Sequence, residues 1–192
     1  MKINLATSLT LSRLAAIPLV LFLYWLPSAW AHKISALLFT YACLTDWLDG
    51  YIARNYSQSS NFGRFLDPVA DKLLVATVLV LLVGLLNKNV LIIPALIIIG
   101  REIVISSLRE WMAEVGEHTS VAVSWLGKIK TVFQMTALGM LLWFQPFGLG
   151  FSIGSGLWVY HVGVLLLYVA SGLTVWSMVI YLKISWSDLT LS

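Results

Sequence analysis

The sequence predicts a single all-α membrane domain over residues 1–192, with six transmembrane helices. Hydrophobic residues make up 59% of the chain and charged residues only 11%, whereas a soluble domain carries about 25% charged residues. Apolar stretches recur along the whole length, and a soluble core could not bury them all. Lipid is therefore the expected solvent for much of the surface.

Each expected span is an apolar run bounded by turn-forming residues. The breaks fall at Pro27–Ser28, Gln58–Asn61, Asn87–Asn89, near Gly116 and in the glycine-rich stretch 146–156. They predict helices over residues 8–30, 34–56, 64–86, 90–113, 123–145 and 158–183. No internal repeat and no soluble domain interrupt this pattern.

The placement of charge predicts the orientation of these spans. Ten of the twelve Lys and Arg residues lie in the half that shares a side with the N-terminus, and Lys33 and Lys88 lie on the other side. Cytoplasmic segments carry such an excess. All nine Asp and Glu lie in the same half, and charges within apolar spans are costly and usually functional. The net charge of +3 is mild, and we expect no nucleic-acid partner.

Two pairs of aspartates lie where the second and third spans meet. Asp46 and Asp49 are three residues apart, and Asp67 and Asp71 are four apart, so each pair shares one helix face. A short loop makes the two spans antiparallel, which puts Asp46 level with Asp71 and Asp49 level with Asp67. Four carboxylates at one depth would repel and protonate unless they share divalent cations. Ligands that are all oxygen favour Mg²⁺, Mn²⁺ or Ca²⁺.

This region resembles the signature of the CDP-alcohol phosphotransferases at every fixed position: Asp46-x2-Asp49-Gly50-x2-Ala53-Arg54-x8-Gly63-x3-Asp67-x3-Asp71. The resemblance implies that family's fold, with six transmembrane helices and commonly a homodimer. It also implies a reaction in which a CDP-activated lipid and an alcohol give a phosphodiester lipid and CMP. The four aspartates would hold two ions, Mg²⁺ or Mn²⁺, and Asp71 would also be the catalytic base. The alternative that Asp71 is only a ligand stays open.

The same resemblance implies a binding site for the CDP group. Its residues would be Gly50, Ala53, Arg54, Gly63, Asn4 and Thr7. Glycine in the hairpin opens space between the helices for a phosphate or a nucleotide. The alternative is that the glycines only allow close helix packing.

Four cations near the inner ends of the fourth and fifth spans point to an anionic acceptor. They are Arg101, Arg109, Lys128 and Lys130. A dianionic phosphate is bound best by more than one cationic donor, whereas inositol or choline would need fewer. The alternative is a structural role, in which Glu102 and Glu110 pair with some of these cations.

Segments 4–7, 10–13, 101–102, 108–113 and 121–131 resemble one branch of the family. That branch joins CDP-diacylglycerol to sn-glycerol 3-phosphate in the bacterial inner membrane, with the active site on the cytoplasmic side. The acceptor would then be sn-glycerol 3-phosphate. Inositol phosphate or phosphatidylglycerol as acceptor stays open. A divalent-cation transporter is the alternative from another class, but stretches 76–86 and 90–99 lack the polar residues of a conduction path.

Overall fold

The computed structural model describes residues 5–56, 61–86, 89–115, 125–144 and 153–191, and describes side chains for 8–46, 66–86, 89–112, 127–144 and 156–183. The described residues form α-helices and one short 3-10 helix, without a strand among them. The elements are α1 (Leu5–Trp25), α2 (Ala29–Tyr56), α3 (Asn61–Leu86), η1 (Asn89–Leu91), α4 (Ile92–Val115), α5 (Trp125–Trp143) and α6 (Ile153–Leu191). The prediction of an all-α fold is confirmed for these residues.

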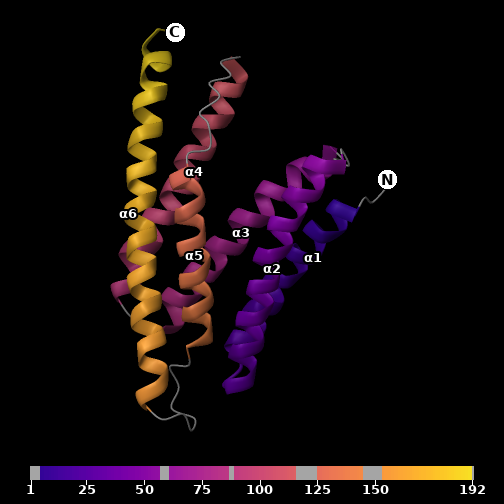
Figure 1. Cartoon of the computed structure of the whole chain (residues 1–192), viewed down its shortest axis with the longest axis vertical. Helices are drawn as coiled ribbons and strands as arrows, with labels where there is room; N and C mark the ends of the chain where they lie inside the picture. Colours follow the sequence, from indigo (N-terminus) through magenta and orange to yellow (C-terminus); the bar gives the residue numbers. More distant parts are fainter. Residues whose placement is uncertain (1–4, 57–60, 87–88, 116–124, 145–152, 192) are drawn as a thin grey trace.

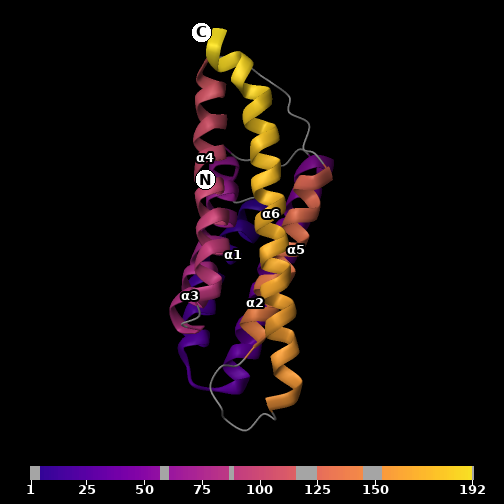
Figure 2. The same ribbon diagram turned by 90° about the vertical axis from the view of Figure 1, so that its left-hand side faces the viewer.

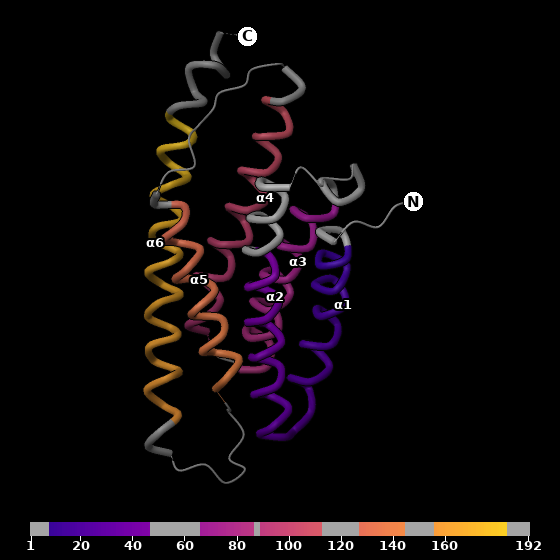
Figure 3. Tube along the Cα trace, turned by 45° about the vertical axis from the view of Figure 1, so that its right-hand side comes forward, coloured from indigo at the N-terminus to yellow at the C-terminus, as the bar shows by residue number. Residues whose placement is uncertain are grey.

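Successive helices run in opposite directions along an elongated bundle (Figures 1 and 3). α1 packs along α2, and α5 packs along α6. α3 crosses the bundle obliquely and packs on α1, while α2 contacts α5 and α4 contacts α6. Figure 2 shows α4, α6 and α5 side by side from a second direction. The arrangement places the end of α2, the start of α3, the end of α4 and the start of α5 toward one end of the molecule.

Apolar side chains fill the core and also cover the outside of the bundle. The core joins all six α-helices through residues such as Val20, Phe39, Leu79, Leu138 and Leu167. Large apolar side chains are also exposed in number along the helices, which a soluble monomer would bury or cover. A lipid environment explains this surface.

Four helical segments are long and apolar enough to cross a membrane: Ser8–Trp25, Leu66–Leu86, Asn89–Met112 and Gly156–Lys183. They correspond to α1, α3, η1 with α4, and α6. Charged residues lie near the C-terminal end of α2 (Asp46, Asp49 and Arg54) and near the start of α5 (Lys128 and Lys130). The described residues therefore have the helices of a multi-pass membrane protein.

The bounds of α1, α2 and α6 differ most from those predicted. α1 ends at Trp25 and α2 already begins at Ala29, because residues 26–28 form a tight turn. In this turn the Leu26 N–H donates to the Leu23 carbonyl and the Ser28 N–H donates to the Leu26 carbonyl, at 3.2 and 2.7 Å. α6 is longer than the predicted span 158–183 because neither the glycines near its start nor the polar residues near its end break the helix.

Candidate active site

α1 brings two polar side chains to the predicted aspartate site. Nη1 of Arg13 lies 2.7 Å from Oδ1 of Asp46 on α2, and the hydroxyl of Thr10 donates a hydrogen bond to Oδ1 of Asp67 on α3. The Arg13 side chain is 1% exposed and that of Asp46 is 45% exposed. The arginine is therefore the buried member of the pair, and the carboxylate keeps an open side.

Asp71 lies one helical turn beyond Asp67 on α3. It interacts electrostatically with Asp46, Arg13 and Glu102, which come from three other helices. Asp71 is therefore close enough to Asp46 and to Glu102 of α4 to be affected by the charges of both. The sequence put Asp71 level with Asp46 but did not relate either residue to Glu102.

The donor set at this site fits Mg²⁺ or Mn²⁺, because every predicted ligand is a carboxylate. Among the side chains that the structure describes, no three of His, Cys, Asp or Glu meet closely enough to hold a metal ion by themselves. The side chain of Asp49, the fourth predicted ligand, lies outside the described residues. The described part of the site therefore consists of Asp46, Asp67 and Asp71, together with Arg13 and Thr10 of α1, which contact Asp46 and Asp67.

The predicted CDP-binding residues lie mostly on described helices, but their side chains lie outside the described set. Thr7 belongs to α1, and Gly63 belongs to α3. Gly50, Ala53 and Arg54 belong to the C-terminal part of α2. Asn4 lies outside the described residues altogether.

Two of the four predicted acceptor-binding cations form ion pairs with one glutamate. Oε1 of Glu102 lies 3.0 Å from Nη1 of Arg101 and 3.3 Å from Nζ of Lys130 on α5. The Arg101 and Lys130 side chains are 12% and 7% exposed, and Glu102 is 30% exposed. A guanidinium has five N–H donors and an ammonium has three, so pairing with Glu102 leaves donors for a ligand on both cations. Pairing and phosphate binding are therefore compatible here.

The other two cations, Arg109 and Lys128, form no ion pair with Glu102 among the described side chains. The guanidinium of Arg109 sits 5.6 Å from the ring centroid of Tyr181 on α6, in a cation–π contact. Arg109 still interacts electrostatically with Lys130. Lys128 is exposed and has no ion pair among the side chains that the structure describes. The four predicted cations therefore fall into two groups. Arg101 and Lys130 pair with Glu102, and Arg109 and Lys128 are called the outlying cations below.

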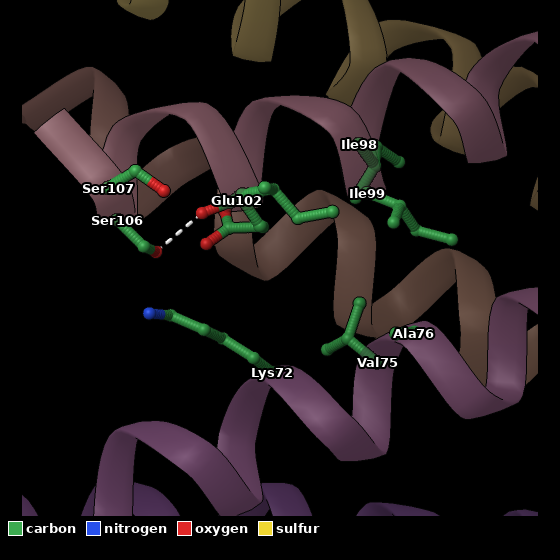
Figure 4. A pocket seen from close by; sticks show the side chains of 9 residues that line it. Lys72, Val75, Ala76, Ile98, Ile99, Glu102, Ser106 and Ser107 are labelled. Atoms are coloured by element: carbon green, nitrogen blue, oxygen red, sulfur yellow. Dashed lines mark hydrogen bonds between the residues drawn. The ribbon is translucent and has the colours of Figure 1, made fainter.

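A pocket of about 320 Å³ opens between α3 and α4, next to this charged cluster (Figure 4). The apolar part of its wall is formed by Val75, Ala76, Ile98, Ile99 and Ile103. Its polar part is formed by Lys72, Glu102, Ser106 and Ser107, and Figure 4 shows Lys72 reaching from α3 toward α4. The pocket is amphipathic and shares Glu102 with the ion-pair cluster.

Thr10, Arg13 and Lys72 are site residues that were not predicted from the sequence. For the two cations a signal was present, because each is a charged residue in an otherwise apolar span, and such residues are usually functional. Thr10 carries no comparable signal. Threonine is common in membrane helices, where its hydroxyl often bonds to the backbone of its own helix.

Comparisons with a family profile and with individual known proteins indicate the same family over nearly the whole chain. The profile of the family described as CDP-alcohol phosphatidyltransferase matches residues 3–182. Proteins of Salmonella choleraesuis and Salmonella typhimurium are each 49% identical over 98% of both chains, and one of Escherichia coli K12 is 47% identical over the same share. All three are named CDP-diacylglycerol–glycerol-3-phosphate 3-phosphatidyltransferase. The chain belongs to the CDP-alcohol phosphatidyltransferase family.

Proposed function

We propose that this protein transfers the phosphatidyl group of CDP-diacylglycerol to sn-glycerol 3-phosphate, giving phosphatidylglycerophosphate and CMP. The observation that carries the proposal is the proximity of Asp71 to two charged groups. It interacts electrostatically with Asp46 on α2 and Glu102 on α4, and Lys72, the next residue on α3, lines one pocket with Glu102. A carboxylate site suited to a metal-bound diphosphate and a cation cluster suited to a phosphate acceptor thereby adjoin one another. The names of the relatives support the same substrates.

Asp46, Asp49, Asp67 and Asp71 hold two divalent cations, Mg²⁺ or Mn²⁺, in this proposal. Asp46 and Asp67 are contacted by Arg13 and Thr10, which supports a prearranged site. When bound, the ions supply positive charge to the diphosphate and to the departing CMP. Gly50, Ala53, Arg54, Gly63, Asn4 and Thr7 form the pocket for the CDP group.

Asp71 acts as the base that receives the proton of the acceptor. The C1 hydroxyl of sn-glycerol 3-phosphate gives its proton to a carboxylate oxygen of Asp71. The hydroxyl oxygen forms a bond to the phosphorus that carries diacylglycerol, and the bond between that phosphorus and the CMP oxygen breaks. CMP leaves with the electron pair of that bond. The surroundings of Asp71 support this role, because it interacts electrostatically with Asp46 of the proposed metal site and with Glu102 beside the acceptor-binding cations.

The acceptor's phosphate is bound by Arg101 and Lys130, with Arg109 and Lys128 at the edge of the site. Glu102 keeps the first two cations together, and their remaining donors are free to bind phosphate oxygens. Nε of Arg101 is buried and has no hydrogen-bond partner among the described residues. A buried donor without a partner costs about 1–3 kcal/mol, so a small shift of Arg101 onto a phosphate oxygen would be favourable.

The pocket between α3 and α4 supports a lipid substrate. Its apolar wall suits part of an acyl chain, and Lys72 with Ser106 and Ser107 suits the polar end of the same molecule. The six helices all cross the bacterial inner membrane in this proposal, with the charged end of the bundle on the cytoplasmic side and two copies forming a homodimer. The excess of Lys and Arg in that half supports the orientation.

The experiment that tests the function is a CMP-release assay on purified protein with a panel of acceptors. We expect CMP release from CDP-diacylglycerol with sn-glycerol 3-phosphate and little with inositol phosphate or phosphatidylglycerol. We also expect EDTA to stop the reaction and Mg²⁺ or Mn²⁺ to restore it. A preference for another acceptor would reject the proposed substrate, and full activity in metal-free buffer would reject the metal site.

A further inference from the structure

Two side chains on one face of α1 reach two different helices of the aspartate site. Thr10 and Arg13 are three residues apart, which places them on the same helix face, and both residues are fully buried. Thr10 donates to Oδ1 of Asp67 on α3, and Arg13 pairs with Oδ1 of Asp46 on α2 at 2.7 Å. α1 therefore connects the two helices that carry the predicted metal ligands.

The Thr10 contact differs from those of other buried threonines in this chain. Thr45 and Thr174 donate to the carbonyls of Ala42 and Ala170 in their own helices, at 2.8 and 2.6 Å, which is the usual bond of a threonine within a helix. Thr10 instead gives its hydroxyl proton to a carboxylate on another helix. Such a bond fixes the rotation of the Asp67 carboxylate, which a backbone-bonded threonine could not do.

Arg13 cannot be explained by packing alone. A guanidinium buried in a membrane helix is costly unless it is paired, and an apolar side chain would fill the same space at lower cost. Its partner Asp46 keeps 45% of its side chain exposed. Each contact is made to Oδ1 of its own aspartate, and a carboxylate has a second oxygen that can bind a cation.

We infer that Thr10 and Arg13 are positioning residues that orient the Asp67 and Asp46 carboxylates toward the divalent cations. This inference rests on the metal site of the proposed function. Partners of metal ligands commonly hold those ligands in the binding geometry, and their replacement lowers metal affinity or activity about 10- to 100-fold. The two residues touch neither substrate in this scheme and act through the aspartates.

The test is Mn²⁺ binding to the metal-stripped, full-length protein, measured by calorimetry without substrate. Thr10→Val keeps the shape of the side chain but removes its donor, and we expect it to raise the Kd for Mn²⁺ about 10- to 100-fold. Thr10→Ser keeps the donor and should bind Mn²⁺ nearly as the wild type does. Thr174→Val is the matched control, because Thr174 is equally buried and bonds only within α6. It should leave the Kd unchanged.

Arg13→Lys gives a second, independent test. Lysine keeps the positive charge but lacks the planar fork that fixes the carboxylate, so a raised Kd would report lost orientation and not lost charge. A wild-type Kd in a folded Thr10→Val or Arg13→Lys protein would overturn the positioning role of that residue while leaving the metal site intact. A wild-type protein that binds no Mn²⁺ would overturn the metal site and this inference together.

Discussion

Nη1 of Arg13 lies 2.7 Å from Oδ1 of Asp46 across the interface between α1 and α2. The buried guanidinium keeps a positive charge beside the first predicted metal ligand. This pair gives Asp46 two roles: it is a metal ligand in the proposed site, and it is the counter-charge of a buried arginine. Asp67, whose Oδ1 accepts a bond from the neutral hydroxyl of Thr10, has only the first role.

The two roles predict different consequences for two similar substitutions. Asp46→Asn and Asp67→Asn should both reduce CMP release below detection, because each removes a ligand charge. Asp46→Asn should also lower the thermal stability of the protein, since it removes the negative charge that lies 2.7 Å from the buried Arg13 guanidinium. Asp67→Asn should not, because an amide oxygen still accepts the Thr10 bond. Activity assays with thermal unfolding in detergent check this. Wild-type turnover in either variant would contradict the role as ligand.

Asp71 should behave differently from Asp46 in substrate binding. As the base, Asp71 is needed for proton transfer, so Asp71→Asn should lower kcat by about 10²- to 10⁴-fold while retaining much of the metal-dependent binding of CDP. Asp46→Asn should weaken that binding strongly. Calorimetry with CDP and Mn²⁺ on the two inactive variants separates these outcomes. An equal loss of CDP binding in both would leave Asp71 as a ligand only.

Glu102 should control the affinity for the acceptor. Glu102→Gln keeps the size of the side chain but removes the charge that holds Arg101 and Lys130 together, and the two cations should then repel one another. We expect the KM for sn-glycerol 3-phosphate to rise about tenfold, equivalent to about 1.4 kcal/mol, with a smaller change for CDP-diacylglycerol. Glu110→Gln is the control, since Glu110 is exposed on the same helix. A rise of equal size for both substrates would point to general damage instead.

The outlying cations give a further test of acceptor binding. Lys128→Ala and Arg109→Ala should each raise the KM for sn-glycerol 3-phosphate about 10- to 100-fold, since a charge-assisted bond contributes about 1.5–3 kcal/mol. Tyr181→Phe keeps the aromatic ring under Arg109 and should change the KM little. Steady-state kinetics with each substrate varied measures this. Unchanged KM values in both alanine variants would assign these cations a structural role.

The helical fold could be predicted from the sequence because its signals are local. Long apolar runs separated by turn residues predicted each α-helix close to its observed position. The boundaries near Trp25 and Ile153 were less accurate, because a three-residue turn and a helix that continues past its apolar part depend on hydrogen bonds that composition does not reveal.

The candidate site was predictable only in part, because its contacts join distant helices. The aspartates of α2 and α3 were identifiable from spacing within one hairpin. The contacts of Arg13 and Thr10 with them connect residues 33 and 57 positions apart, and no local pattern predicts which helix packs on that hairpin. The pairing of Lys130 with Glu102 spans 28 positions, so the sequence could identify both charges but not decide between pairing and phosphate binding.

The measurement that tests the central claim most directly is product identification by mass spectrometry, with purified protein, CDP-diacylglycerol and isotope-labelled sn-glycerol 3-phosphate. If the aspartate site and the Glu102 cluster work as one active site, the lipid product should be phosphatidylglycerophosphate carrying the label, formed in equal amount to CMP and lost in Asp71→Asn. Phosphatidic acid formed at the same rate with or without the acceptor would contradict the claim, because the phosphatidyl group would then pass to water.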